Sequence, residues 1–232
     1  MSSTASSRIF ASGLALLILT GCASHTPENS LFKDDFRSLD NWQVEAEKPG
    51  RISAANGVLD IDVPAGATLW FKPRLEGPLC IEFEAIAVAE GGPNDQVSDL
   101  NVFWMANNVD GLEPVFAHVR SGKFEDYNPL RTYYVGLGGN RNTTTRFRRY
   151  IGDPVLRPLR PEDNLAGDPY MLVPNQRETI RLVAKGQVIE YWRNGTRVFS
   201  MEDAAPYENG WFALRTTYSH LRISHLRIRR MH

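Results

Sequence analysis

The sequence predicts an all-β fold, a sandwich or a barrel, and three observations support this. Short stretches alternate apolar and polar residues, as in residues 57–63 (GVLDIDV), which is the pattern of a strand with one buried face. Lys-Gly and Asn-Gly pairs, which favour tight hairpin turns, separate some of these stretches. Helical periodicity is scarce, and strands that follow one another without intervening helices favour all-β architectures.

The expected strands run from residue 57 to the C-terminal end. Residues 178–201 hold strands separated by turns at Lys185-Gly186 and Asn194-Gly195. Two further strands, residues 209–217 and 220–230, close the chain. The earlier expected strands are residues 57–63, 68–73, 80–88, 100–106, 114–119, 132–138 and 143–150.

Residues 151–177 interrupt this rhythm. They contain prolines at positions 154, 158, 161, 169 and 174, and proline cannot donate a hydrogen bond to a sheet. A loop of this length inside a compact domain is usually functional or disordered. Because the segment also contains apolar residues, we expect it to pack as a wall or lid beside the stretch that precedes it. Those apolar residues are Val155, Leu156, Leu159, Tyr170, Met171 and Leu172.

The chain begins with a short apolar run, residues 9–19, after a single arginine. The run is too short for a membrane-spanning helix and is typical of a secretory signal. It ends in LTGC, which resembles the lipobox of bacterial lipoproteins, in which cleavage leaves Cys22 as a lipid-modified N-terminus. An ordinary signal peptide with a chance cysteine is the alternative. Ala23 follows in place of an aspartate, which favours the outer membrane.

This signal divides the chain into a signal peptide at residues 1–21, a tether at 22–29 and a single β-sandwich domain at 30–232. With Cys22 lipidated, Cys80 has no disulfide partner and is expected to be a small buried residue. A lipid anchor makes the membrane a partner of the chain. Since an envelope lipoprotein meets little nucleic acid, nucleic-acid binding is excluded.

Several well-known active sites are absent from the sequence. No His or Cys cluster has zinc spacing, and there is no P-loop, no GxSxG motif and no dinucleotide fingerprint. We therefore expect no metal and no cofactor. Calcium is the one alternative, held by Asn94, Asp95 and Asp99 or near Asp34 and Asp35, although the same residue types also make turns.

Three long segments carry a resemblance to a known superfamily. Residues 32–45, 56–85 and 188–228 resemble the concanavalin A-like jelly-roll proteins, in which an early D-F…W segment and a late N-G…F…R-T segment lie on neighbouring strands. The resemblance implies a jelly-roll sandwich of two antiparallel sheets, here with a long Pro-rich loop.

A narrower resemblance rests on residues 91–106 and 133–150. These resemble a bacterial family of such sandwiches linked to polysaccharide utilisation, pectin-type glycans among them. The resemblance implies a polysaccharide or oligosaccharide partner, but the superfamily includes hydrolases, lyases, lectins and binding modules. The chain lacks both the E-x-D-x-x-E strand of laminarinases and the Q-I-H motif of alginate lyases.

The most unusual stretch is residues 137–150 (LGGNRNTTTRFRRY), which holds four arginines in a chain with a formal net charge of −1. Its flanks predict a hairpin around a Gly-Asn turn. The pairing that we expect sets Tyr134 against Arg146 and Thr132 against Arg148, so that these side chains share one face. On the concave face of a jelly roll, such guanidinium groups would bind the carboxylates of uronic acids.

A histidine near the C-terminus is a further candidate. His220 alternates with Arg222 on the polar side of its expected strand, and the family resemblance implies a histidine at this position. The candidate catalytic residues are His220, Tyr134 and Arg146. The candidate substrate-binding residues are Arg148, Asn140, Asn142, Thr144, Arg215 and Trp104.

Simpler interpretations remain open for several of these residues. The arginines of the hairpin could pair with Glu82 and Glu84 on a solvated sheet face. Those two glutamates, roughly 7 Å apart along a strand, could instead be the carboxylate pair of a glycosidase. Trp104 could belong to the core.

Two functions from different classes remain after these exclusions, and a purely structural role in the envelope is a third possibility. The first is an enzyme that cleaves an acidic, uronate-containing polysaccharide by β-elimination or hydrolysis. In elimination, an arginine would neutralise the uronate carboxylate while Tyr134, favoured as a phenolate by Arg146, or His220 removes the C5 proton. The alternative is a surface glycan-binding lipoprotein without catalysis.

Overall fold

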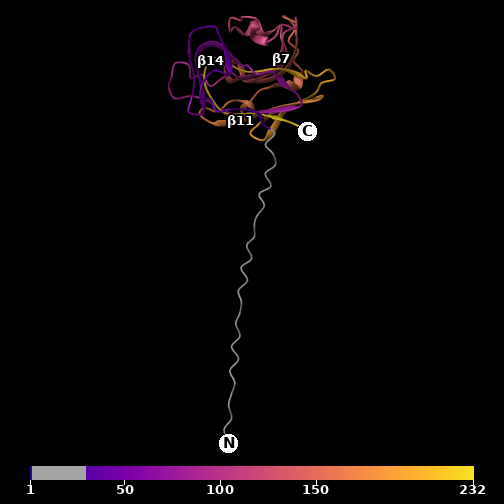
Figure 1. The fold of residues 1–232 in the computed structure, drawn as a ribbon. Helices are drawn as coiled ribbons and strands as arrows, with labels where there is room; N and C mark the ends of the chain where they lie inside the picture. Colours follow the sequence, from indigo (N-terminus) through magenta and orange to yellow (C-terminus); the bar gives the residue numbers. More distant parts are fainter. Residues whose placement is uncertain (2–29) are drawn as a thin grey trace.

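The computed structural model describes Met1 and residues 30–232 (Figure 1). The predicted lipidation site Cys22, the tether at 22–29 and, apart from Met1, the signal peptide at 1–21 lie outside the described residues. Within the described part of the chain, no helix is long and apolar enough to cross a membrane. The strands are β1 (Ser30–Asp34), β2 (Trp42–Ala46), β3 (Arg51–Ala55), β4 (Val58–Phe71), β5 (Leu75–Glu76), β6 (Leu79–Ala87), β7 (Leu100–Asn107), β8 (Arg131–Gly138), β9 (Thr144–Ile151), β10 (Asn164–Leu165), β11 (Arg177–Lys185), β12 (Val188–Arg193), β13 (Thr196–Glu202) and β14 (Asn209–Arg230).

The helical elements are short. They are the 3-10 helices η1 (Val115–Ala117), η2 (Phe124–Tyr127), η3 (Pro161–Asp163) and η4 (Asp168–Tyr170), and the single turn α1 (Gly139–Asn142). The predicted all-β fold is therefore confirmed.

The strands form two antiparallel layers, stacked in Figure 1 with β7 in one and β11 in the other. The long strands β4 and β14 take part in both layers, because each pairs with one set of neighbours in one half and another set in the other half. The first layer has the order β10-β9-β8-β7-β14-β4-β2, and the second has the order β13-β12-β11-β6-β14-β4-β3. As predicted, N-terminal and C-terminal strands are adjacent, since β1 pairs with β14.

The main core lies between the layers, and the alternation of β6 shows how the sequence produces it. Ile81 and Phe83 are buried, while Glu82 and Glu84 between and beyond them point outward and are partly exposed. Cys80 is also on the outward side, where burial, with the nearby Glu82 charge, raises the pKa of its thiol to about 11. The thiol is therefore protonated at neutral pH. The expectation of a buried Cys80 is corrected, because the residue is only half-buried on the outer side of β6.

A second, smaller core covers part of the outer face of the first layer. It contains Trp70, Phe103 and Trp211 from three strands and Val115 and Tyr127 from the segment 108–130, which folds over them. In Figure 1 this segment rises beyond the layer that contains β7. The expected strand at residues 114–119 is wrong, because residues 115–117 form the helix η1, from which Val115 and Phe116 pack against the second core.

The loop at residues 151–177 borders the arginine stretch, as predicted. Its β10 pairs with β9, setting Asn164 against Arg146 and Leu165 against Thr145. The two expected closing strands are one continuous strand, β14, with a bulge at Tyr218.

Candidate functional site

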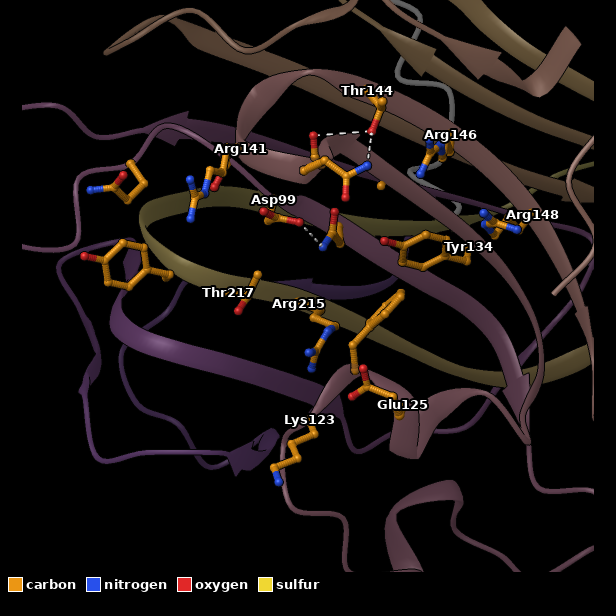
Figure 2. A pocket seen from close by; sticks show the side chains of 18 of the residues that line it. Asp99, Lys123, Glu125, Tyr134, Arg141, Thr144, Arg146, Arg148, Arg215 and Thr217 are labelled. Atoms are coloured by element: carbon orange, nitrogen blue, oxygen red, sulfur yellow. Dashed lines mark hydrogen bonds between the residues drawn. The ribbon is translucent and has the colours of Figure 1, made fainter. Parts of the chain in front are cut away.

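A pocket with a volume of about 740 Å³ opens on the outer face of the first layer, beside the second core (Figure 2). This volume lies within the range of small-molecule sites. Its lining comes from the strands of the first layer, the loops before β7 and before β8, the turn between β8 and β9, and the loops that follow β2 and β9. The lining residues are Glu47, Gln96, Ser98, Asp99, Asn101, Lys123, Phe124, Glu125, Tyr134, Gly136, Gly139, Asn140, Arg141, Thr144, Arg146, Arg148, Arg157, Arg215, Thr217 and Tyr218.

The face of the hairpin β8–β9 that carries Tyr134, Arg146 and Arg148 lines this pocket, but the two strands pair in a register other than the predicted one. Tyr134 pairs with Arg148 and Gly136 with Arg146, so the expected pairing of Tyr134 with Arg146 is wrong by two residues. The turn is longer than expected, because Asn140, Arg141 and Asn142 in succession adopt left-handed backbone conformations. A shift of two residues leaves each side chain on the same face of the sheet, so Tyr134, Arg146 and Arg148 still share one.

The arginines of the pocket lack carboxylate partners. Arg146 donates from Nε to Asn164 Oδ1 at 2.7 Å, and Arg148 donates from Nη1 to the Arg157 carbonyl oxygen at 2.5 Å. Within the described part of the chain, neither forms an ion pair, and the same holds for Arg141 and Arg157. Burial lowers the pKa of Arg148, and the neighbouring cations Arg157 and Arg146 lower it further. The pocket therefore carries uncompensated positive charge.

The glutamates considered as partners for these arginines lie on the other layer. Glu82 pairs with Arg229 at 3.0 Å and Arg181 at 3.5 Å, and Glu84 pairs with Arg177 at 3.0 Å. The hypothesis that the hairpin arginines pair with Glu82 and Glu84 is therefore wrong. Neither glutamate lines the pocket, so they do not serve as a carboxylate pair there.

Tyr134 is 7% exposed, and its hydroxyl makes no hydrogen bond with another described residue. The lack of a side chain at Gly136 leaves room for it: a Cβ atom there would lie 2.5 Å from Tyr134 Oη. Burial raises the pKa of Tyr134 well above its ordinary value, and repulsion from Tyr150 and Asp99 adds to this. Tyr134 is thus a neutral phenol, contrary to the expected phenolate.

Asp99 is a pocket residue that the sequence suggested only as a calcium ligand. Its Oδ1 accepts a hydrogen bond from Asn101 Nδ2 at 3.2 Å, and its backbone N–H donates to the Gly138 carbonyl oxygen. Burial raises the pKa of Asp99 above its ordinary value, against the opposing effects of Asn101, Ser98 and Arg215. A carboxyl group with a raised pKa in a pocket is a candidate for proton transfer.

The backbone around Asp99 is strained. Val97 has φ +48° and Asp99 has φ +58°, and a β-branched residue such as valine is rarely found in this region. Such conformations cost of order 1–3 kcal/mol each and cluster at functional sites. The strain is consistent with a loop held in place to position Asp99.

Tyr218 reaches the pocket because of the bulge in β14. The register of β14 with β4 shifts between Thr217 and Ser219, and Tyr218 has φ +50°. Bulges redirect side chains next to active sites. Tyr218 is 48% exposed, so one face of its ring is available to a ligand.

Arg215 is only 2% exposed and holds the segment 108–130 in place. Its Nη1 donates to Thr68 Oγ1 at 2.8 Å and to the Gly122 carbonyl oxygen at 2.9 Å. The guanidinium lies over the rings of Tyr127 and Phe124, at 4.9 and 5.1 Å from their centroids. Arg215 therefore lines the pocket while it fixes one of its walls.

The structure separates the remaining substrate-binding candidates. Asn140 and Thr144 line the pocket and are bonded to each other, Nδ2 to Oγ1 at 3.0 Å. Asn142 turns away and bonds with the backbone of Leu172. Trp104 is fully buried between the layers. Side chains alternate along β7, so Trp104 points inward while Asn101 and Phe103 point to the outer face. The expectation that Trp104 binds substrate is therefore corrected.

His220 does not line the pocket either, so it is not placed to remove a proton from a ligand there, contrary to the expectation of a catalytic His220. Its ring is 6% exposed and lies between two carboxylates, Nδ1 at 3.0 Å from Asp95 Oδ1 and Nε2 at 3.3 Å from Asp60 Oδ2. Asp95 belongs to the loop that also carries Asp99. His220 thus ties this loop to β4, and its contact with the pocket is indirect.

The residues weighed as calcium ligands are occupied by protein groups. Asp95 Oδ2 accepts the backbone N–H groups of Glu90 and Gly92, and Asp34 accepts those of Phe36 and of the Trp42 ring. Among the described residues, no group of three or more His, Cys, Asp and Glu side chains has the arrangement of a metal site.

Lys123 and Glu125 are functional candidates that the sequence did not reveal. Figure 2 shows both across the pocket from Arg141 and Thr144. They lie at the short 3-10 helix η2 of the segment 108–130, which has no periodic pattern in the sequence that would place them. Asp99 could have been found from its position directly before a strong strand pattern, since loop residues at strand ends commonly carry function.

The fold and the pocket together define a class: an all-β sandwich with a cationic pocket on the outer face of one layer. Within that class, the sequence model of the family described as "Domain of unknown function (DUF6250)" matches residues 61–226, and the chain belongs to this family. A comparison with curated proteins finds no match.

Solved structures show the same fold. A Bacillus subtilis protein of unknown function with a galectin-like fold has a TM-score of 0.63 at 13% identity, over 87% of this chain and 96% of that one. The carbohydrate-binding module CBM66 from Bacillus subtilis has a TM-score of 0.55 at 8% identity, over 82% and 95%. An endo-β-1,3-glucanase from Pyrococcus furiosus has 0.54 at 9% identity, over 86% and 93%. These likenesses confirm the predicted jelly-roll sandwich.

Proposed function

We propose that this protein binds an acidic, uronate-containing glycan in the pocket and cleaves it by β-elimination. The observation that carries the proposal is the set of guanidinium groups without carboxylate partners, Arg141, Arg146, Arg148 and Arg157. Six cationic side chains line the pocket against three carboxylates, in a chain whose formal net charge is −1. A guanidinium fork matches a carboxylate in a bidentate manner.

The rest of the lining suits a sugar. Tyr218 offers an exposed ring face for stacking on a pyranose. Asn140, Thr144 and Thr217 offer amide and hydroxyl groups for sugar hydroxyls. Structures with this fold include a carbohydrate-binding module and an endo-glucanase, which supports a glycan ligand.

Elimination fits the chemistry of the pocket. An arginine that pairs with the uronate carboxylate stabilises the charge that develops there when the C5 proton leaves. Hydrolysis is the second candidate, because Glu47, Asp99 and Glu125 also line the pocket and glycosidases use two carboxylates. The alternative to an enzyme is a protein that binds the glycan without cleaving it.

We further propose that the protein is a lipoprotein of the cell envelope, in the outer membrane, anchored through Cys22. The sequence LTGC after a short apolar run supports this. Metabolic labelling with a fatty acid in a bacterial host tests it. Label should enter the wild-type chain and be absent from Cys22→Ala.

The proposed function is tested with the purified full-length protein in detergent and a panel of acidic polysaccharides. Each polysaccharide is paired with a copy in which the uronate carboxyl groups have been chemically reduced to alcohols. We expect binding to the acidic form, loss of binding to the reduced form, and products that absorb ultraviolet light through a double bond conjugated to the carboxylate. Equal binding to both forms would show that carboxylates are not recognised and would contradict the proposal.

A further inference from the structure

We infer that Asp99 and Tyr134 form the proton-transfer pair of the pocket, with Asp99 taking the C5 proton of a bound uronate and Tyr134 donating a proton to the departing O4. Because both groups belong to one wall, they serve a syn elimination. The inference rests on the proposed function and narrows its substrate class. The substrates are uronates whose C5 hydrogen and C4 oxygen lie on the same face of the ring.

The two side chains come from neighbouring parts of one sheet. Asp99 directly precedes β7, and Tyr134 lies on β8, which pairs with β7. Asn101 lies between them. Its Nδ2 donates a hydrogen bond to Asp99 Oδ1. A Cβ atom placed on Gly136 would lie 3.1 Å from Asn101 Oδ1 and 2.5 Å from Tyr134 Oη, so both atoms lie beside this glycine. In Figure 2, Asp99 and Tyr134 extend into the same space.

Two polar groups of this cluster lack a hydrogen-bond partner. The Tyr134 hydroxyl makes no hydrogen bond within the described part of the chain. Asn101 is 3% exposed, and its buried Oδ1 accepts no hydrogen bond from another described residue. A buried polar group without a partner costs free energy, and a sugar that hydrogen-bonds to the Tyr134 hydroxyl would recover part of this cost.

The electrostatics assign the two roles. Burial raises the pKa of Asp99 above its ordinary value, which makes its carboxylate a stronger base than an exposed aspartate. Burial and the Asp99 charge raise the pKa of Tyr134, which keeps the phenol protonated. A carboxylate that accepts a proton and a phenol that holds one can divide the base and acid roles between them.

The proposed reaction balances without a further reactant. Asp99 takes the proton from C5, and the electron pair of the C–H bond forms the C4–C5 double bond. The C4–O4 bond breaks, its electron pair goes to O4, and O4 takes the proton from Tyr134. Protonated Asp99 then returns a proton to the Tyr134 phenolate, by way of solvent in the pocket. The net change is the transfer of one proton from C5 to O4.

Ring stereochemistry makes the inference specific. In glucuronate and mannuronate, the C5 hydrogen and O4 lie on the same face of the ring. In galacturonate and guluronate they lie on opposite faces, so a base and an acid on opposite sides of the sugar are needed. A pocket with Asp99 and Tyr134 on one wall should cleave the first two and leave the others intact.

The first experiment compares four polymers, polyglucuronate, polymannuronate, polygalacturonate and polyguluronate, with the full-length protein. Cleavage confined to polyglucuronate, polymannuronate or both supports the inference. Cleavage of polygalacturonate or polyguluronate overturns it. Binding of these polymers without any cleavage also overturns it while leaving the glycan-binding part of the proposed function intact. No binding to any acidic glycan sinks the proposed function itself.

The second experiment assigns the roles by following exchange of the C5 hydrogen for deuterium in D₂O by NMR. Asp99→Asn should lower turnover by at least about 100-fold and abolish exchange, with affinity for the polymer within about threefold of wild type. Tyr134→Phe should lose cleavage but keep the exchange, because Asp99 still removes the proton. Glu84→Gln, the same kind of change on the second layer, is the control and should match wild type. Exchange that survives in Asp99→Asn and disappears in Tyr134→Phe would assign the base to Tyr134 and overturn the inference.

Discussion

The sharpest prediction concerns Arg148, whose guanidinium lines the pocket without a carboxylate partner. Arg148→Ala removes from the protein one hydrogen bond, to the Arg157 carbonyl oxygen. Because the donor is charged, this bond contributes about 1.5–3 kcal/mol. The substitution also removes repulsion from the neighbouring Arg146 and Arg157 cations, which offsets part of the loss. We therefore expect the free energy of unfolding to fall by less than about 3 kcal/mol.

The effect on glycan affinity should be larger. A hydrogen bond between charged groups is worth about 1.5–3 kcal/mol, which corresponds to a rise in Kd of about 10- to 150-fold. Arg148→Lys should fall between wild type and the alanine variant, because it keeps the charge and loses the bidentate fork. Isothermal titration calorimetry with an acidic oligosaccharide measures all three values, and the loss should shrink at high salt.

The matched control is Arg181→Ala. Arg181 is on the second layer, where it pairs with Glu82 at 3.5 Å and lies over Trp192. Removing it subtracts the same charge from the protein and no group from the pocket. An equal loss of affinity in both alanine variants would mean that net charge alone governs binding, and the role assigned to the pocket would be refuted.

Three further predictions follow from the same structure. His220→Ala should destabilise the fold by about 3 kcal/mol, because Asp60 and Asp95 lose the partner that they share. Calorimetry should show a fall in Tm of about 6–12 °C. An unchanged Tm would contradict the role of His220 in linking the Asp95 loop to β4. Burial raises the pKa of Glu45 above 4.5, so the folded state holds this proton more tightly than the unfolded state does, and the contribution of Glu45 to stability falls as pH rises from 4.5 through the folded-state pKa. The Tm of Glu45→Gln relative to wild type should therefore increase over that range, and a decrease would contradict the burial effect. Tyr218→Ala should weaken glycan binding about three- to tenfold with unchanged Tm; unchanged affinity would exclude stacking on this ring.

The sequence predicted the sandwich because its strands obey a simple rule. In β6 the apolar residues Ile81, Phe83 and Ala85 alternate with polar ones, and burial follows this alternation. The same rule identified the shared face of Tyr134, Arg146 and Arg148 even though the register was wrong. Period-2 alternation is unchanged by a shift of two residues, so the face was predictable while the cross-strand partners were not.

The residues that escaped prediction owe their positions to irregular backbone. Tyr218 reaches the pocket through a bulge with φ +50°, and Asp99 itself has φ +58° two residues after Val97 at φ +48°. Such conformations are held by tertiary contacts, such as the bond between His220 and Asp95, and leave no periodic signal in the sequence. Alternation correctly placed His220 on the polar side of its strand, but it does not reveal which loop covers a side chain.

Whether the charge of an arginine on a strand is neutralised depends on which side chains the neighbouring strands place beside it. On the second layer, Arg229 of β14 lies near Glu82 of β6, and the two pair at 3.0 Å. On the first layer, Arg148 and Arg146 of β9 face Tyr134 and Gly136 on one side.

On the other side of β9, the neighbour of Arg146 is Asn164 of β10. An amide and a carbonyl oxygen hold these guanidinium groups in position without neutralising them. These two cations are oriented by neighbouring strands that supply no anion to pair with them. Since a carboxylate has the size and planar shape to match a guanidinium fork, we propose a uronate as the ligand of this face.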